Sequence, residues 1–276
     1  MPDPFADNAV GATTLFGMPV DPITMETAVE RCLRALDSRT PFTVGVLNAA
    51  KTVRLRTDST LRESLLGCDM LLADGQAVVW AGNLLGCPLP ERVTGIDLFT
   101  ELLEYADTQQ RSVYLLGADQ EVLDTLVDTL TVQYPQLRIA GHHHGYFDIE
   151  DCAGIVRDIR ESGADMLFIG MPSPLKENFL RRWEAELGVL LRHGVGGSFD
   201  VLAGFTKRAP ERWQRLGLEW AYRLVQEPRR MWRRYLDTNS RFVVLALTEL
   251  VRRTPPYTRT DDGEPGHRPI VREHHG

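Results

Sequence analysis

The run Val113-Tyr-Leu-Leu116 and the amphipathic stretch behind it, from Gln120 to Tyr134, decide the fold of this chain. The first run is apolar throughout, which is typical of a strand that helices cover on both faces. In the second stretch apolar residues recur at helical spacing, and Pro135 ends the pattern. A further apolar run follows at 137–140. This alternation predicts βα units around a mostly parallel sheet.

The same alternation extends to both sides of this stretch. It predicts a helix at 151–162 that Gly163 closes, and strands at 43–47, 70–73, 166–169 and 189–192. We therefore expect a Rossmann-like α/β fold with helices on both faces of the sheet, followed by a helical appendage. The boundaries that we expect are a catalytic domain at 1–206, the appendage at 207–253 and a disordered tail at 254–276.

The composition excludes several classes of function. The 276 residues carry a formal net charge of −7, which argues against a general nucleic-acid binder. The four cysteines lack metal-site spacing, so we expect reduced, buried thiols. Neither a signal peptide nor a run of about 18 apolar residues is present, and a cytoplasmic location is expected.

Polar residues follow the predicted strands, and ligands of open α/β sheets bind beyond the carboxyl ends of the strands. Asn48 follows the first strand and Asp74 the second. A carboxylate that emerges from an apolar strand into a cleft can act as a general base. An aspartate before a helix is also a favoured N-cap, and spacing alone leaves both roles open for Asp74.

Two further segments could bind an anion. In Gly194-Val-Gly-Gly-Ser-Phe-Asp200, the N–H groups of Gly196 and Gly197 could approach a phosphate, although a plain tight turn is an equal alternative. Arg92 precedes a predicted helix that Thr94 could cap. Its guanidinium could bind a diphosphate or form a surface salt bridge.

Three consecutive histidines, His142, His143 and His144, suggest a metal site at first sight. Side chains of consecutive residues at a strand end point in different directions, so they would not converge on one ion. We therefore expect no metal site here, and expect these residues to line or close the pocket.

The segment from Lys207 to Arg234 combines nine basic residues with Trp213, Trp220, Tyr222 and Trp232. This composition is typical of helices that lie in the interface of an anionic membrane. A solvated basic helix with its aromatic residues in the core is the alternative. Nucleic acid is disfavoured because no recognisable binding module is present.

Six stretches in the right order resemble one family: Leu72-Ala-Asp-Gly, Pro90-Glu-Arg-Val-Thr-Gly-Ile-Asp-Leu, His144-Gly-Tyr-Phe, Gly194-Val-Gly-Gly-Ser-Phe-Asp, Lys207-Arg-Ala-Pro and Leu216-Gly-Leu-Glu-Trp-Ala-Tyr-Arg-Leu-Val-Gln-Glu-Pro-Arg-Arg. The chain resembles the WecG/TagA/CpsF glycosyltransferases from about Pro41 to Phe242. The resemblance implies inverting transfer without a metal or other cofactor. The donor would be a UDP-sugar of the N-acetylmannosamine, N-acetylmannosaminuronate or glucose type, and the acceptor a sugar on undecaprenyl diphosphate.

The resemblance also implies roles for individual residues. Asp74 would be the catalytic base, and Arg223, Arg230 and Arg233 of the appendage would hold the acceptor diphosphate. The expected substrate-binding residues are Asn48, Arg92, Thr94, Asp97, Lys176, Glu177, Gly196 and Gly197. Two departures touch this pocket: Val46-Leu-Asn48 lacks a hydroxyl that many members have, and Pro174-Leu-Lys-Glu177 places the Lys176 cation where a glutamine is usual.

We therefore expect a glycosyltransferase of surface-polysaccharide or cell-wall polymer synthesis, peripheral on the inner face of the cytoplasmic membrane. The sequence leaves homo-oligomerisation open. One alternative is a nicotinamide-dependent nucleotide-sugar oxidoreductase, but the first predicted strand is followed by Asn48-Ala-Ala-Lys-Thr52, which is no GxGxxG motif. The other is a non-catalytic scaffold recruited to the membrane through the appendage.

Overall fold

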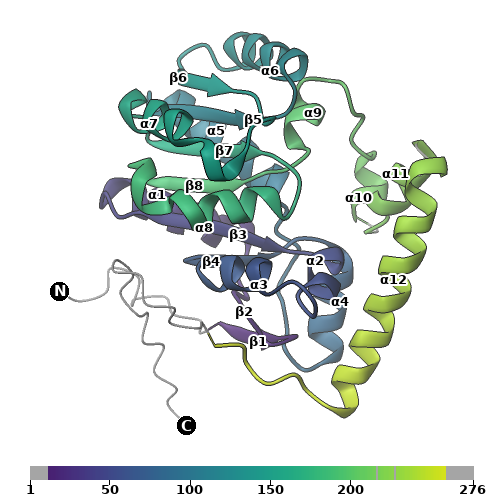
Figure 1. The fold of residues 1–276 in the computed structure, drawn as a ribbon. Coiled ribbons are helices and arrows are strands. Elements are labelled where there is room, and N and C mark those ends of the chain that lie inside the picture. Colours follow the sequence, from purple (N-terminus) through teal and green to yellow (C-terminus); the bar gives the residue numbers. More distant parts are fainter. Residues whose placement is uncertain (1–11, 216, 227, 259–276) are drawn as a thin grey trace.

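The computed structural model describes residues 12–215, 217–226 and 228–258. Within these ranges its centre is a six-stranded parallel sheet in the order β4-β3-β8-β7-β5-β6 (Figure 1). The strands are β3 (Phe42–Leu47), β4 (Met70–Ala73), β5 (Ser112–Gly117), β6 (Arg138–His143), β7 (Met166–Gly170) and β8 (Leu191–Gly194). All the predicted strands are confirmed, with β8 lying two residues later than expected.

Helices cover both faces of the sheet. One face carries α1 (Met25–Asp37), α5 (Gly95–Thr108) and α6 (Gln120–Gln133), and the other carries α3 (Ser59–Leu66), α7 (Ala153–Ser162) and α8 (Leu175–Leu187). Leu115 and Phe168 pack with the first layer, whereas their neighbours Leu116 and Ile169 pack with the second. Successive strand residues point to opposite faces, so burial of both faces explains why β3, β4, β5 and β7 are largely apolar.

Helix boundaries follow local signals that the sequence displays. Asp119 caps α6 by accepting a hydrogen bond from the Val122 N–H (2.9 Å). Gly163 ends α7 in the left-handed conformation (φ 63°), as expected. A short helix, η2 (Ile149–Asp151), occupies the residues just before α7.

A hairpin that the sequence analysis did not predict precedes the sheet. Its strands β1 (Thr13–Leu15) and β2 (Met18–Val20) are antiparallel and are joined by Phe16 and Gly17, which both have positive φ (53° and 81°). Two positive φ values suit the twist of a two-residue hairpin loop. Each strand has three residues and the turn has no Asn-Gly or Asp-Gly signature, which is why local patterns gave no signal.

The last part of the chain is helical, with α10 (Glu211–Arg215), α11 (Glu219–Gln226) and α12 (Pro228–Val251). Figure 1 shows α12 running along the side of the domain beside α2 (Ala49–Arg54) and α4 (Gln76–Leu84). Phe242 of α12 is buried and stacks on Phe16 of the hairpin turn (centroids 5.5 Å apart). None of the described helices meets the length and apolarity that crossing a membrane requires.

Beyond α12 the described chain folds back on the hairpin. The Tyr257 N–H donates to the Gly17 carbonyl oxygen (2.8 Å), and the Arg62 guanidinium lies 4.7 Å from the Tyr257 ring centroid. Of the tail expected at 254–276, residues 254–258 therefore contact the domain. Residues 259–276 lie outside the described residues.

Candidate active site

Two expected site residues stand at the ends of neighbouring strands. Leu47 and Ala73 are paired across β3 and β4, and Asn48 and Asp74 follow them directly. The Asp74 N–H donates to the Leu47 carbonyl oxygen (2.8 Å), which continues the pairing past the strand ends. Both side chains are half-buried at the carboxyl edge of the sheet.

Asp74 does not cap the helix that follows it. The N-cap position of α4 belongs to Gly75, whose φ of 115° favours glycine and which has no side chain to accept a capping hydrogen bond. The alternative role that the sequence left open for Asp74 is therefore wrong. Asn48, by contrast, is an N-cap, because its Oδ1 accepts a hydrogen bond from the Lys51 N–H (3.0 Å) at the start of α2.

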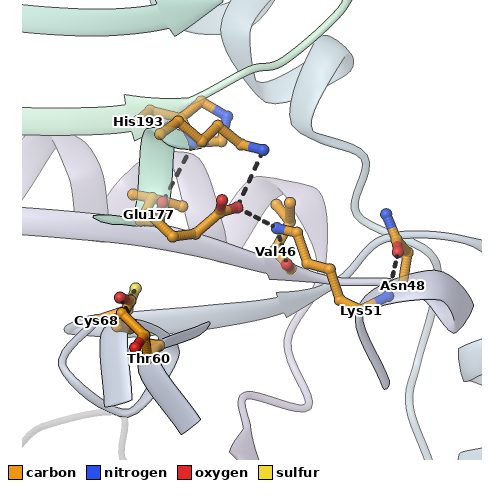
Figure 2. A network of polar contacts seen from close by, with 10 residues as sticks. Val46, Asn48, Lys51, Thr60, Cys68, Glu177 and His193 are labelled. Atoms are coloured by element: carbon orange, nitrogen blue, oxygen red, sulfur yellow. Dashed lines mark hydrogen bonds and ion pairs between the residues drawn. The ribbon is translucent and has the colours of Figure 1, made fainter. Parts of the chain in front are cut away.

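A buried ion-pair network lies beside these strand ends, and Figure 2 shows part of it. The Lys51 Nζ lies 2.8 Å from the Glu177 Oε1 and donates to the Val46 carbonyl oxygen (2.6 Å). The Lys176 Nζ lies 3.0 Å from the same Glu177 oxygen. The three residues are only 5–6% exposed. Lys176 and Glu177 thus belong to one network with Lys51, which the sequence analysis did not single out, and their substrate-binding role stays a prediction.

Burial shapes the protonation of this network. It lowers the pKa of Lys176 to about 8, with the Lys51 ammonium contributing in the same direction and the Glu177 and Asp74 carboxylates opposing it. For Glu177 burial alone would raise the pKa, but the two ammonium groups lower it to about 2. Glu177 is therefore ionised at neutral pH, and Lys176 is the member of the network that can change its charge near physiological pH.

The glycine turn after β8 differs from its expected role. The N–H of Gly196 donates to the Ile169 carbonyl oxygen (3.1 Å), so it is not available to an anion, and the role expected for it does not fit. A side chain at Gly194 would meet the Lys176 Cδ at 2.7 Å, and one at Gly196 would stand 3.9 Å from the Lys176 Nζ. Gly197 precedes α9 (Ser198–Leu202). The turn thus makes room for the Lys176 side chain.

The loop before α5 and the first turn of α5 carry three further expected residues. Thr94 caps α5, with its Oγ1 accepting from the Asp97 N–H (3.2 Å). Arg92 pairs with Glu219 at the start of α11 (Nη1–Oε2 2.9 Å), and Asp97 pairs with Arg208 (2.6 Å). The Arg92 side chain is 13% exposed, so the Arg92–Glu219 pair is partly buried and differs from the surface salt bridge that the sequence left open.

The other expected residues are placed as follows. Arg223 lies in α11 and Arg230 and Arg233 lie in α12, but their side chains lie outside the described residues. His142 and His143 end β6, the edge strand at the opposite end of the sheet from β4. His143 therefore ends at the same carboxyl edge as Asn48 and Asp74, but β6 lies four strands away from β3 in the strand order, and the pocket role expected for the histidines stays a prediction.

The sequence held faint signals for the two residues that were missed. Only three of the 31 Lys and Arg residues are lysines, and Lys51 is one of them. Glu219 is one of few acidic residues in the basic segment 207–234. Neither signal indicates a partner, because both partners lie far away along the chain.

A Rossmann-like parallel sheet with polar residues at its carboxyl edge defines this protein as an open α/β fold, the class whose ligands bind beyond the carboxyl ends of the strands. Within that class the chain belongs to the glycosyl transferase WecG/TagA/CpsF family, whose profile matches residues 13–256. It is a glycosyltransferase, and the resemblance noted in the sequence is confirmed.

Three proteins similar to this chain share one name. A Bacillus spizizenii protein is 36% identical over 194 residues, covering 70% of this chain and 74% of its own length. A Bacillus subtilis protein is 32% identical over 202 residues (73% and 78%), and a Staphylococcus aureus protein 39% over 163 residues (59% and 63%). Each is named N-acetylglucosaminyldiphosphoundecaprenol N-acetyl-beta-D-mannosaminyltransferase.

Proposed function

We propose that this enzyme transfers N-acetylmannosamine from a UDP-sugar to N-acetylglucosamine carried on undecaprenyl diphosphate, with inversion at the anomeric carbon. The names of its relatives favour this sugar over the N-acetylmannosaminuronate and glucose types. The observation that carries the proposal is the position of Asp74 at the tip of β4, beside Asn48 and within electrostatic reach of Lys176. A carboxylate and a cation at one edge suit a reaction that removes a proton and releases a diphosphate.

Asp74 acts as the general base in this mechanism. It takes the proton of an acceptor hydroxyl, whose oxygen forms a bond to the anomeric carbon. The bond from that carbon to the diphosphate oxygen breaks, and UDP leaves with the electron pair. Cations placed where this negative charge develops lower the activation barrier of the transfer. Arg92, in the loop before α5, is one candidate for this role.

The appendage closes the site in this proposal. Gly217 packs directly on the first residue of α4, since a side chain at Gly217 would stand 2.4 Å from the Gln76 Cβ. The Arg92–Glu219 and Asp97–Arg208 pairs join the same segment to the loop before α5 and to the first turn of α5. The start of α11 therefore lies against the turn that carries Asp74. We keep 1–206 as the catalytic domain and 207–253 as the appendage on this basis.

The outward face of α12 supports a membrane role. Large apolar side chains that are 48–65% exposed recur at helical spacing along it: Trp232, Leu236, Val243, Leu247 and Leu250. The opposite face packs on the domain through Phe242, Leu245 and Ala246. The arginine-rich start of α12 can contact anionic lipid headgroups, and the apolar stripe that follows it along the helix can insert among them. The lipid-linked acceptor lies in such a membrane. We place the enzyme on the inner face of the cytoplasmic membrane accordingly.

The direct test incubates the purified enzyme with a panel of UDP-sugars and a short-chain prenyl-diphosphate N-acetylglucosamine acceptor, and identifies products by mass. We expect a product that is one N-acetylhexosamine heavier, formed only with UDP-N-acetylmannosamine, with anomeric configuration opposite to that of the donor. Ligand titration distinguishes the alternatives, because an oxidoreductase would bind NAD(P) and a scaffold would bind neither ligand. Failure to form product with any donor would overturn the proposal.

A further inference from the structure

Lysine is rare in this protein, and its use is concentrated at one place. Three of the 31 Lys and Arg residues are lysines: Lys51, Lys176 and Lys207. Two of the three are buried and contact the same oxygen of Glu177. Burial readily shifts the pKa of a lysine, whereas an arginine guanidinium stays charged. The buried basic residues of this network are therefore of the kind whose charge can change.

The three residues in direct contact, Lys51, Lys176 and Glu177, carry two positive charges and one negative charge. Two ammonium groups share the Glu177 Oε1, and the Glu177 Oε2 is buried without a hydrogen-bond partner. Lys176 also stands in the first turn of α8, where the positive end of the helix dipole disfavours a cation. Burial of an incompletely balanced charge is costly, so this arrangement favours the binding of an anion.

The groups that face Lys176 come from several elements. Lys51 lies in α2, Glu177 in α8, and Asp74 at the end of β4 acts on it through its charge. From β8, His193 is neutral at pH 7, because burial lowers its pKa to about 4. Glu63 of α3 and Glu184 of α8 line the same cavity as Lys176. Besides Glu177, the carboxylate of Asp74 raises the pKa of Lys176, and in the proposed reaction Asp74 accepts a proton and loses its charge.

The glycine turn leaves room beside this charge. Gly194 leaves the space that the Lys176 stem occupies, and a side chain at Gly196 would stand beside the ammonium. Because the Gly196 N–H is already bonded to Ile169, the positive group beside the turn that remains for an anion is the Lys176 ammonium and not that N–H.

We propose that Lys176 binds a diphosphate group at this edge of the sheet, and that Lys51 is a positioning residue that occupies Glu177 and keeps Lys176 from being neutralised. This inference rests on the proposed function, in which both substrates carry a diphosphate. Affinity for the diphosphate then falls as pH rises through about 8, where the Lys176 ammonium loses its proton.

The scarcity of lysine makes the test direct. In protein labelled with ¹³C-lysine, three side-chain signals are expected, and Lys176→Gln and Lys51→Met assign two of them. Titration from pH 6 to 11 is run without ligand, with UDP, and with farnesyl diphosphate, which separates the nucleotide from the lipid source. We expect one of the two to raise the pKa of Lys176. We also expect Lys51→Met to raise it without ligand, because a neighbouring positive charge is removed.

Binding measurements complete the test. Lys176→Gln is expected to weaken binding of that diphosphate at pH 7 by about 10- to 100-fold, the worth of one charge-assisted hydrogen bond, and to remove the pH dependence near 8. Arg157→Gln, which removes a positive charge from an exposed position on α7, is the matched control and should leave affinity unchanged.

Two results would separate this inference from the proposed function. The inference is wrong and the proposed function stands if wild type transfers sugar while Lys176→Gln binds both diphosphates normally. The same conclusion follows if wild type transfers sugar but neither ligand shifts the Lys176 signal. If wild type binds neither diphosphate and forms no product, both are wrong. The titration itself is done on wild-type protein, and the variants serve only to assign the lysine signals. If Lys176→Gln does not fold, Lys51→Met still helps to assign them.

Discussion

Arg92 and Glu219 form an ion pair (Nη1–Oε2 2.9 Å) that joins the loop before α5 to the first turn of α11. The arginine expected to support a diphosphate is therefore held by the appendage. The second oxygen of Glu219 is buried without a hydrogen-bond partner, so the carboxylate is not fully satisfied by this contact. Docking of the appendage and the charge of the candidate site are linked through this pair.

Replacing Asp74 by Asn removes the proposed base while keeping the size of the side chain. We expect turnover to fall by about 10²- to 10⁴-fold, as is usual for loss of a general base, with UDP affinity nearly unchanged. Product mass spectrometry and UDP titration measure the two effects. Asp119→Asn, at the cap of α6, is the control for a general effect of Asp-to-Asn changes. Near-normal turnover of Asp74→Asn would refute the assigned role.

A double-mutant cycle on Arg92 and Glu219 tests the link between appendage and site. Glu219→Gln should lower kcat/KM about fivefold, equivalent to about 1 kcal/mol for a partly exposed pair, and should add little when Arg92 is already Gln. Asp237→Asn breaks the exposed Asp237–Arg241 pair on α12 (2.7 Å) and should change nothing. Additive effects of the two site changes would show that the pair does not couple them.

Gly217→Ala should release the start of α11 from the domain. The substitution adds a side chain at a φ of 68° and at 2.4 Å from the Gln76 Cβ. Gly204→Ala is the matched control, because its φ is 82° but nothing lies within 4 Å. We expect about 1–2 kcal/mol of backbone strain for both, and about 1–3 kcal/mol more for Gly217 from the clash. Hydrogen exchange of α11 should rise only in Gly217→Ala; equal protection in the two variants would contradict this.

His193 should make the protein sensitive to mild acid. Burial lowers its pKa to about 4, and its Nε2 lies 3.1 Å from the Gly95 carbonyl oxygen. Between pH 6.5 and 4 the unfolded chain binds a proton that the folded protein does not, so stability falls as pH falls through this window, by about 3 kcal/mol from this group.

The measurement is urea unfolding of wild type and His193→Gln at several pH values. The variant has no group that titrates at this position, so the difference in unfolding free energy between the two proteins should change between pH 6.5 and 4. The same difference at every pH would contradict the prediction.

The apolar stripe of α12 gives a test of membrane docking. Leu236→Glu with Leu247→Glu replaces two exposed side chains, and liposome partitioning should fall about tenfold or more, because burying one leucine contributes about 1.5–3 kcal/mol. Val132→Glu, at an exposed position on α6, is the control. Co-sedimentation with anionic liposomes measures binding, and UDP affinity should stay unchanged. Undiminished sedimentation of the double variant would refute the docking face.

The sequence by itself determined the sheet and the edge at which its polar residues meet. Strands buried on both faces are mostly apolar, and parallel strands place their carboxyl ends together, so the position of Asn48 and Asp74 at one edge followed from local pattern. That β3 and β4 are neighbours is seen only in the structure. The hairpin of β1 and β2 was not predicted, because its strands are short and its turn, Phe16-Gly17, is not one of the usual hairpin turn sequences.

Only the tertiary structure decided which charges meet. Lys51, Lys176 and Glu177 converge because α2 and α8 pack beside the same strands, and Arg92 meets Glu219 because α11 returns to the loop before α5. Such pairs depend on the packing of elements that are distant along the chain, and no local periodicity encodes it. The hydrogen bond from Gly196 to Ile169 likewise exists only once β7 and β8 are paired.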